Sequence, residues 1–411
     1  MDGPAMYQDV AILFAFAFVY ALIAGRLERT SVAGALVFTV FGLAVGPEGL
    51  NWLRLDVHAQ SLRTLAEFTL ALVLFTDAAN ADLRVLRLNY TIPERLLLIG
   101  LPLTILLGTA AAAVLFPALG IIERALLATM LAPTDAALGK AVVVNPAVPA
   151  PIREGLNVES GLNDGICVPL LLVLLALAGE PVGGAGSWNL ALHHFVEEIG
   201  IGLVVGTGLA VAGVWALRFS ADRGWLSTTW RQLPAIALAF TTFAAAQALG
   251  GSGFIACFVG GIAAGALARH QERKHELLLS AEGSGDLFGL LTWVLFGAAV
   301  IGQALGRLTW EVLAYAVLSL TAIRMIPVWL ALVGADLRAD GKLFLGWFGP
   351  RGLASIVFAV IVLDANLPGS ETLTATVAWT VILSILAHGL TASPLANAFA
   401  RRIGTTQAPV P

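Results

Sequence analysis

Residues 342–363 read KLFLGWFGPRGLASIVFAVIVL, an apolar run of membrane-crossing length that is interrupted by Gly349, Pro350, Arg351 and Gly352. Proline removes a backbone donor and clashes with the preceding turn, and glycine accepts unwound geometry. Unwound backbone at membrane depth is tolerated only where protein buries it or where it lines a cavity. The sequence therefore predicts an interrupted helix that carries an arginine inside its break.

A second run carries the same kind of interruption. Residues 125–144 read ALLATMLAPTDAALGKAVVV, with Pro133, Thr134 and Asp135 at the middle. An ordinary proline kink is the alternative at either run taken alone. Two interrupted helices in corresponding positions of two sequence halves are typical of transporters built from inverted repeats. We expect Asp135 to neutralise helix N-termini, and Arg351 helix C-termini, where the half-helices meet.

The composition is that of an integral membrane protein. Of 411 residues, 58% are hydrophobic and 12% are charged, whereas a soluble domain carries about 25% charged residues. Runs of about 20 apolar residues, enough to cross a bilayer as a helix, follow one another along the chain. Thirteen spans are predicted, at 9–25, 31–49, 63–80, 95–116, 121–142, 156–178, 194–217, 232–249, 252–268, 284–303, 309–334, 342–363 and 372–392. The net charge of −4 offers no basic face, so we expect no nucleic-acid partner.

Lysine and arginine fall mainly on one side of these spans. When the loops are taken alternately, 17 of the 23 cations lie on one side and 4 on the other. Cytoplasmic loops carry the excess of positive charge, which predicts a multi-pass protein of a prokaryotic plasma membrane with its N-terminus outside and its C-terminus in the cytoplasm. The two remaining cations, Arg324 and Arg351, lie within spans. A charge at the bilayer centre costs about 2.5–3.5 kcal/mol on insertion scales, so both need a buried partner or a water-filled cavity.

A polar wedge occupies the start of the sixth span, just before a long apolar run. Ser160, Asn163 and Asp164 stand at i, i+3 and i+4 and therefore share one helix face, and Glu159 lies at the edge of that face. Glu159 is expected to form a buried ion pair with Arg324, because Arg351 is already assigned to helix ends.

With the two deep arginines assigned elsewhere, a proton or a small metal cation is the species that we expect to neutralise Asp164. The two would compete for one carboxylate. Hard oxygen ligands suit an alkali cation such as Na+. The expected ligands are the oxygens of Asp164, Asp135, Ser160 and Thr134.

Competition at one carboxylate predicts exchange of a cation for a proton by alternating access. Two other classes of function are the alternatives. Residues 283–286 (GSGD) resemble the motif of intramembrane aspartyl proteases, but that chemistry needs a second aspartate, and the usual Tyr-Asp partner does not occur in the sequence. A channel needs several weak sites along a path, whereas the polar residues here cluster at one depth. We expect a transporter that uses no cofactor, and not an enzyme.

Four segments together resemble the monovalent cation/proton antiporters of the NhaP type, which are related to the animal sodium/proton exchangers. They are APTDA (132–136), ESGLND (159–164), the stretch Arg324 to Trp329, and WFGPRGLAS (347–355), and the resemblance covers essentially the whole chain. It implies an all-α polytopic protein of thirteen helices with two inverted repeats and crossed broken helices. It also implies a homodimer in which a six-helix core domain moves like an elevator against a dimerisation domain.

The resemblance implies roles for individual residues. The aspartate at 164 exchanges cation for proton, and the positions of Thr134, Asp135 and Ser160 help to hold the cation. The pair Glu159 and Arg324 is structural. Exchange of Na+ or Li+ for H+ follows from this family, and K+/H+ exchange is the alternative that the sequence leaves open.

Further positions bear on the stoichiometry and on the ligand set. Asn163 before the aspartate is like the electroneutral branch, since the electrogenic branch usually carries two aspartates. Family members often read Thr-Asp-Pro where Ala136 stands here, which moves the helix breaker to Pro133. Many relatives carry a glutamate in the third span where this chain has Asp77, which either takes that part near the cation or caps the helix end.

The expected division treats residues 1–411 as a single transporter unit. It assigns 1–92 to dimerisation-side helices, 93–178 to the first half of the core, 179–306 to a linker and further dimerisation-side helices, 307–400 to the second half of the core, and 401–411 to a short cytoplasmic tail.

Overall fold

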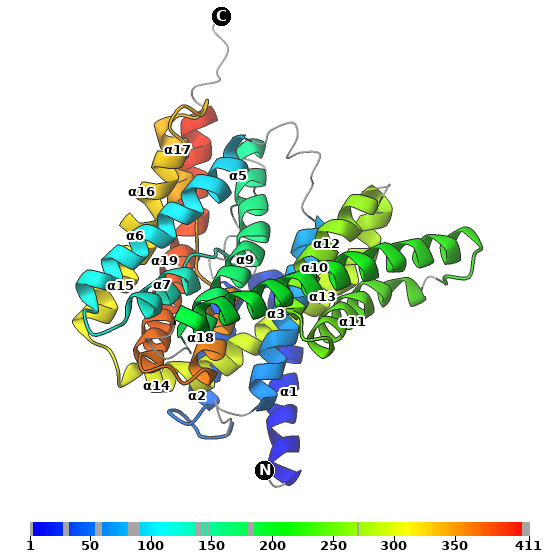
Figure 1. Ribbon diagram of the computed structural model, residues 1–411, viewed down its shortest axis with the longest axis horizontal. Coiled ribbons are helices and arrows are strands. Elements are labelled where there is room, and N and C mark those ends of the chain that lie inside the picture. Colours follow the sequence, from blue (N-terminus) through cyan, green and yellow to red (C-terminus); the bar gives the residue numbers. More distant parts are fainter. Residues whose placement is uncertain are drawn as a thin grey trace, which may run out of the picture. The chain divides into compact units, whose positions relative to one another are not determined.

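The computed structural model describes residues 3–27, 33–53, 60–80, 91–135, 138, 142, 145, 148–178, 185–227, 229–268 and 271–404. Every regular element within these ranges is a helix, which confirms the expected all-α class (Figure 1). Seven of the described helices are long and apolar enough to cross a membrane, and four other apolar helices are shorter. The total of thirteen spans stays a prediction.

The chain divides into two compact units. The first comprises residues 1–63, 91–160 and 290–411, and the second comprises 64–90 and 161–289. The predicted division into core and dimerisation-side segments concerns which part moves, and it stays a prediction. Helix α9 (Ala150–Ala178) runs without interruption through the change from the first unit to the second.

The first unit contains most of the short helices. They are α1 (Gly3–Leu27), α2 (Gly34–Val45), α5 (Thr91–Arg95), the π-helix η1 (Leu96–Gly100), α6 (Leu101–Leu115), α7 (Ile121–Met130), the π-helix η3 (Phe296–Ile301), α14 (Gly302–Leu305), α15 (Trp310–Leu320), α16 (Ala322–Ala331), α17 (Ala339–Trp347), α18 (Leu353–Asp364) and α19 (Ser370–Gly404). Helix α6 packs against α7, α16 packs against α17, and α19 packs against both α15 and α18. Leu96, Val328, Leu345 and Ala396 belong to one buried apolar core of this unit.

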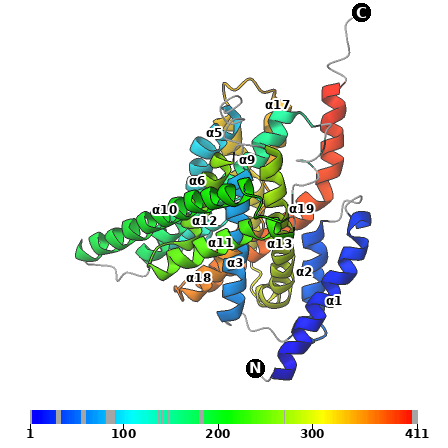
Figure 2. The same cartoon turned by 90° about the vertical axis from the view of Figure 1, so that its right-hand side faces the viewer.

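The second unit contains α3 (Gln60–Asn80) from residue 64 onward, α10 (Ala185–Asp222), the short helix η2 (Thr229–Gln232), α11 (Pro234–Ala248), α12 (Gly253–Leu267) and most of α13 (Gln271–Leu295). Helices α10, α11 and α12 pack side by side, as both ribbon views show (Figures 1 and 2). The backbones of α10 and α12 approach closely at Gly206. A Cβ atom at this position would lie 2.3 Å from the carbonyl oxygen of Ala256, so only glycine permits the approach. Two predicted spans are parts of longer helices, since 194–217 lies within α10 and 372–392 within α19.

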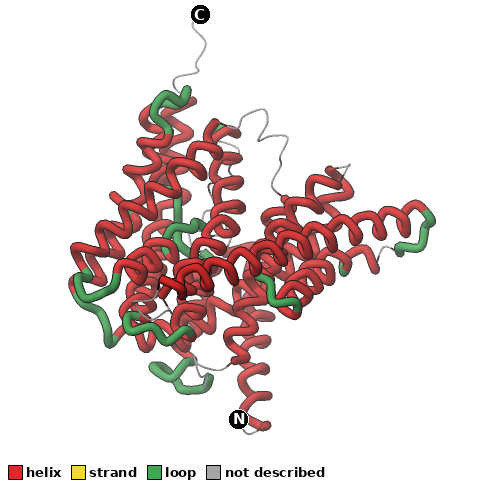
Figure 3. The backbone as a smooth tube through the Cα atoms, in the orientation of Figure 1, coloured by secondary structure: helices red, strands yellow, loops and turns green. Residues whose placement is uncertain are grey.

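Three helical runs are interrupted within the described part of the first unit, and Figure 3 colours loops and turns green. In the run 342–363, α17 ends at Trp347 and α18 begins at Leu353, so the expected break is present. The run 121–142 stops being helical after Met130, and most of its continuation beyond residue 135 lies outside the described residues. The third interruption, at Thr321 between α15 and α16, was not predicted from the sequence.

Candidate functional site

Asp135 joins the two predicted breaks. Its backbone N–H donates to the carbonyl oxygen of Pro350 at 2.8 Å, and its Oδ2 accepts from the N–H of Leu353 at 3.0 Å. Leu353 is the first residue of α18, so the carboxylate meets the positive end of a helix dipole. The approach requires glycine at position 352, because a Cβ atom there would lie 1.9 Å from Oδ2 of Asp135.

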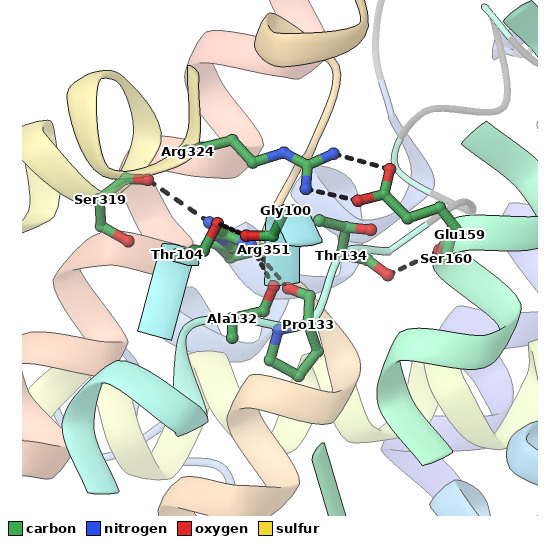
Figure 4. Close-up of polar contacts among 10 residues, drawn as sticks. All are labelled: Gly100, Thr104, Ala132, Pro133, Thr134, Glu159, Ser160, Ser319, Arg324 and Arg351. Carbon is green, nitrogen blue, oxygen red and sulfur yellow. Dashed lines mark hydrogen bonds and ion pairs between the residues drawn. The ribbon is translucent and has the colours of Figure 1, made fainter. Parts of the chain in front are cut away.

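Arg351 is fully buried and reaches back from the second break to the first (Figure 4). Its Nη1 donates to the carbonyl oxygens of Ala132 at 2.6 Å and Pro133 at 3.1 Å. Its Nη2 lies 3.5 Å from the carbonyl oxygen of Ser319. Ser319 lies in the last turn of α15, whereas Ala132 and Pro133 follow the end of α7 at Met130. Carbonyls at and just beyond a helix C-terminus lack intrahelical donors, so one guanidinium serves two such places.

Arg324 and Glu159 form a bidentate ion pair, with Nη1 to Oε1 at 2.5 Å and Nη2 to Oε2 at 2.7 Å. Both residues are 1% exposed. The guanidinium also packs against the second break at Gly349. A Cβ atom at this position would lie 2.4 Å from Nε of Arg324. The structure thus brings the two residues of the expected pair together beside the interrupted helix (Figure 4).

Ser160 connects α9 to the first break. Its hydroxyl donates to the carbonyl oxygen of Thr134 at 2.6 Å, and both residues are buried (Figure 4). The next turn of the same unbroken helix carries Asn163 and Asp164, which are 1% and 8% exposed. Asp164 stands four residues after Ser160 in this helix, so the two residues share one helix face.

Asp77 is half-buried in the last turn of α3, which ends at Asn80. Its Cβ would lie 3.5 Å from a Cβ atom placed on Gly161, so Asp77 lies beside the part of α9 that carries the polar wedge. A carboxylate at a helix C-terminus opposes the helix dipole. Both expected roles of Asp77, beside the cation or at the helix end, stay predictions.

Sequence reasoning missed two polar side chains of α19 that touch the second break. The hydroxyl of Ser384 accepts from the backbone N–H of Arg351 at 2.7 Å, and Nε2 of His388 lies 2.9 Å from the carbonyl oxygen of Trp347. Both side chains are fully buried. The available signal was their spacing of four residues inside an apolar span, which puts both on one helix face.

Comparisons with known proteins agree with this architecture. The family described as "Sodium/hydrogen exchanger, transmembrane" matches residues 12–398. The K(+)/H(+) antiporter NhaP2 of Shewanella oneidensis is 24% identical over 390 residues, which cover 95% of this chain and 66% of that protein. The K(+)/H(+) antiporter NhaP of Alkalimonas amylolytica is 27% identical over 392 residues, which cover 94% of this chain and 66% of that protein. The chain thus spans about two thirds of the length of these curated relatives.

A solved structure shares the fold. The sodium proton antiporter MjNhaP1 from Methanocaldococcus jannaschii at pH 8 matches with a TM-score of 0.76 and 21% sequence identity. The match covers 96% of this chain and 99% of that one. The likeness extends over both compact units and establishes the fold.

Proposed function

Because the chain belongs to the sodium/hydrogen exchanger family, we propose that it is a secondary antiporter that exchanges monovalent cations for protons across a membrane. The observation that carries the proposal is a buried carboxylate, Asp164, one turn along α9 from a hydroxyl bonded to a helix break. A carboxylate in a poorly hydrated site binds either a proton or a small cation, so the two compete. Exchange follows if only the loaded forms of the site change access from one side to the other.

The proposed cation ligands are oxygens of Asp164, Asp135, Ser160 and Thr134. The hydroxyl of Ser160 donates its proton to the carbonyl of Thr134, which leaves the lone pairs of the hydroxyl to face a cation. Hard oxygen donors of this kind suit Na+ or Li+. Asn163 and Asp77 are proposed as further residues that bind the cation or the proton.

The other buried charges are proposed to support the site without taking part in exchange. Glu159 and Arg324 neutralise each other, and their bidentate geometry fixes both side chains. Arg351 compensates the ends of two helices through three carbonyl groups. These roles predict losses of stability, and not of ion selectivity, when the residues are replaced.

Sodium or lithium is the proposed cation, exchanged one for one with a proton without net charge movement. The Asn163–Asp164 order, which resembles the electroneutral branch, supports this stoichiometry. Potassium/proton exchange is the second candidate, because the two curated relatives described above are named K(+)/H(+) antiporters, whereas the solved structure described above is that of a sodium proton antiporter.

The proposal extends to the whole protein. We propose thirteen membrane spans in a prokaryotic plasma membrane, with the N-terminus outside and the C-terminus in the cytoplasm. A homodimer is proposed in which a core domain carries the ion by an elevator movement. The shared fold and the asymmetry of loop cations support these features.

The test uses purified protein in liposomes that carry a pH gradient and a trapped pH dye, with lithium, sodium, potassium and calcium added in turn. Sodium and lithium should dissipate the gradient with saturable rates, and clamping the membrane voltage should leave the rates unchanged. Asp164→Asn should abolish exchange. The matched control is Glu154→Gln, which makes the same chemical change at an exposed position of α9 and should exchange normally.

Each outcome bears on a separate part of the proposal. Unchanged exchange in Asp164→Asn would contradict the role of that carboxylate. A rate that depends on voltage would contradict electroneutrality alone. Dissipation by potassium but not sodium would select the second candidate, and flux that neither saturates nor needs an opposing proton gradient would indicate a channel.

A further inference from the structure

The face of α19 that touches the second break carries Ser384, His388 and Thr391, at i, i+4 and i+7. Ser384 and His388 have no exposed surface, and Thr391 is half-buried. The other polar residues of this predicted span, 372–392, are all threonines in its first half. Buried polar groups are retained where they satisfy other polar groups, so the partners of these three residues indicate what they do.

The partners stand on both sides of the break. Before it, Trp347 is the last residue of α17, and its carbonyl oxygen lies 2.9 Å from Nε2 of His388. The indole Nε1 of the same tryptophan donates to Oγ1 of Thr391 at 3.0 Å. After the break, the backbone N–H of Arg351 donates to Oγ of Ser384 at 2.7 Å. One helix face therefore supplies three hydrogen bonds that straddle the unwound segment.

The donors and acceptors give these bonds a direction. The carbonyl of Trp347 only accepts, so Nε2 of His388 must carry a proton. The N–H of Arg351 only donates, so Ser384 Oγ accepts. Nδ1 of His388 lies 3.2 Å from that Oγ and 3.0 Å from the backbone carbonyl oxygen of Ser384. The imidazole of His388 therefore links the carbonyl of residue 347 to Ser384, which in turn bonds the N–H of residue 351.

This link matters because the break contacts the first interrupted helix. The carbonyl of Pro350 accepts from the N–H of Asp135, and the side chain of Arg351 reaches the carbonyls of Ala132 and Pro133. Fixing the backbone at residues 347 and 351 therefore fixes the partners of Asp135, which is a proposed cation ligand. Unwound backbone has no helical hydrogen bonds of its own to hold it in this position.

We propose that Ser384 and His388 are positioning residues for ion exchange. They act through the backbone of the second break on the placement of Asp135 and Arg351, and they do not touch the ion. The proposal rests on the proposed antiport for its transport readout. The structural test does not assume antiport, because it measures how well the backbone N–H of Arg351 is protected from hydrogen exchange.

The transport test measures the rate of sodium-dependent dissipation of a pH gradient against sodium concentration, using full-length protein in liposomes. Ser384→Ala and His388→Leu should raise the apparent KM about two- to tenfold, the factor that corresponds to one hydrogen bond of ordinary strength. His388→Gln keeps a donor and an acceptor on one side chain and should restore a KM within about twofold of wild type. Each variant's thermal unfolding midpoint is measured in parallel.

The matched control is Thr380→Val on the same helix. Thr380 is fully buried, but its hydroxyl bonds only to the carbonyl of Thr376 within α19, so this variant should keep the wild-type KM. If Ser384→Ala behaves like Thr380→Val, the proposal is overturned. It is also overturned if the KM follows the unfolding midpoint across all variants, because that pattern indicates a merely structural role.

The second measurement is amide hydrogen exchange of the peptide that contains residues 347–353, followed by mass spectrometry. Ser384→Ala should speed exchange in this peptide about two- to tenfold, because the Arg351 N–H loses its acceptor, and Thr380→Val should not. Ser384→Ala removes one oxygen atom and carries both tests if His388→Leu does not fold. If the wild-type protein shows no antiport but Ser384→Ala still speeds amide exchange, the proposed function is rejected and the positioning role is kept. If Ser384→Ala and Thr380→Val show equal amide exchange, the positioning role is rejected.

Discussion

At the scale of single residues, the buried pair of Arg324 and Glu159 depends on the small residue beside it. Both charged groups are buried, and each neutralises the other through two hydrogen bonds. Gly349 leaves room for the guanidinium, since a Cβ atom there would lie 2.4 Å from its Nε. A charge left alone in such an interior is costly, because neither water nor a partner compensates it.

Replacing one member of this pair should therefore destabilise the protein strongly. Arg324→Met should lower the free energy of unfolding by about 3–5 kcal/mol, because it leaves Glu159 buried without its partner. The measurement is thermal unfolding of purified protein in detergent. The double variant Arg324→Met with Glu159→Leu should recover much of the loss, because no buried charge remains.

The control for this prediction is Arg338→Met. Arg338 pairs with Asp340 at 3.4 Å, but its side chain is 64% exposed, and exposed pairs contribute little. Equal unfolding midpoints for Arg324→Met and Arg338→Met would contradict the importance of the buried pair.

Elimination among charges made this pairing predictable from the sequence, because few charged residues lie within apolar spans. The contact of Asp135 with Leu353 was predictable only as a type, a carboxylate at a helix N-terminus. Its partner is a backbone N–H, which every residue except proline carries, so no residue type marks it. The approach also depends on the absence of a side chain at Gly352. That requirement is visible only in the structure, where this glycine lies against Asp135.

At the scale of elements, helix breaks were predictable where glycine and proline cause them. The break between α17 and α18 follows from Gly349, Pro350 and Gly352. The break at Thr321 has no such mark, because no glycine or proline occurs between residues 310 and 326. There the hydroxyl of Thr321 donates to the carbonyl of Val317 at 2.6 Å, so a side chain serves a carbonyl in the last turn of α15.

Arg351 should stabilise the protein by donating hydrogen bonds to carbonyl groups near the ends of two helices. Arg351→Met removes the charged donor from the carbonyls of Ala132, Pro133 and Ser319, and we expect a loss of about 2 kcal/mol or more in the free energy of unfolding. Arg351→Lys keeps the charge but offers a single ammonium group in place of a planar fork, so its unfolding midpoint should lie between those of wild type and Arg351→Met. Thermal unfolding checks this order. A lysine variant no more stable than the methionine variant would contradict compensation by charge.

At the scale of the whole molecule, composition and apolar run length predicted the class, and the family match agrees with it. The grouping of helices into compact units was not predictable. In the second unit, a Cβ atom at Gly261 of α12 would lie 2.4 Å from the carbonyl oxygen of Phe75 of α3, although nearly half the chain separates them. Such backbone approaches depend on complementary shape, which hydropathy does not encode.

The predicted orientation belongs to this scale and is open to a labelling test. Single cysteines at Leu50 and at Arg402, both exposed, are introduced after Cys167 and Cys257, both buried, are changed to alanine. A membrane-impermeant maleimide should label Leu50→Cys in intact cells and Arg402→Cys only after permeabilisation, because cytoplasmic loops hold 17 of the 23 cations in the predicted orientation. The reverse pattern would invert the orientation, and labelling of both sites in intact cells would contradict an odd number of spans.

The bonds that join residues 132–135 to residues 350–353 have a consequence for engineering. The amide of Asp135 is bonded to Pro350, its carboxylate is bonded to Leu353, and Arg351 is bonded to Ala132. A chimera could take one of these segments from a homologue and keep the other. Its helix ends and charged side chains would then face hydrogen-bonding partners from a different protein. The two segments, more than 200 residues apart in sequence, are therefore one module and should be exchanged together.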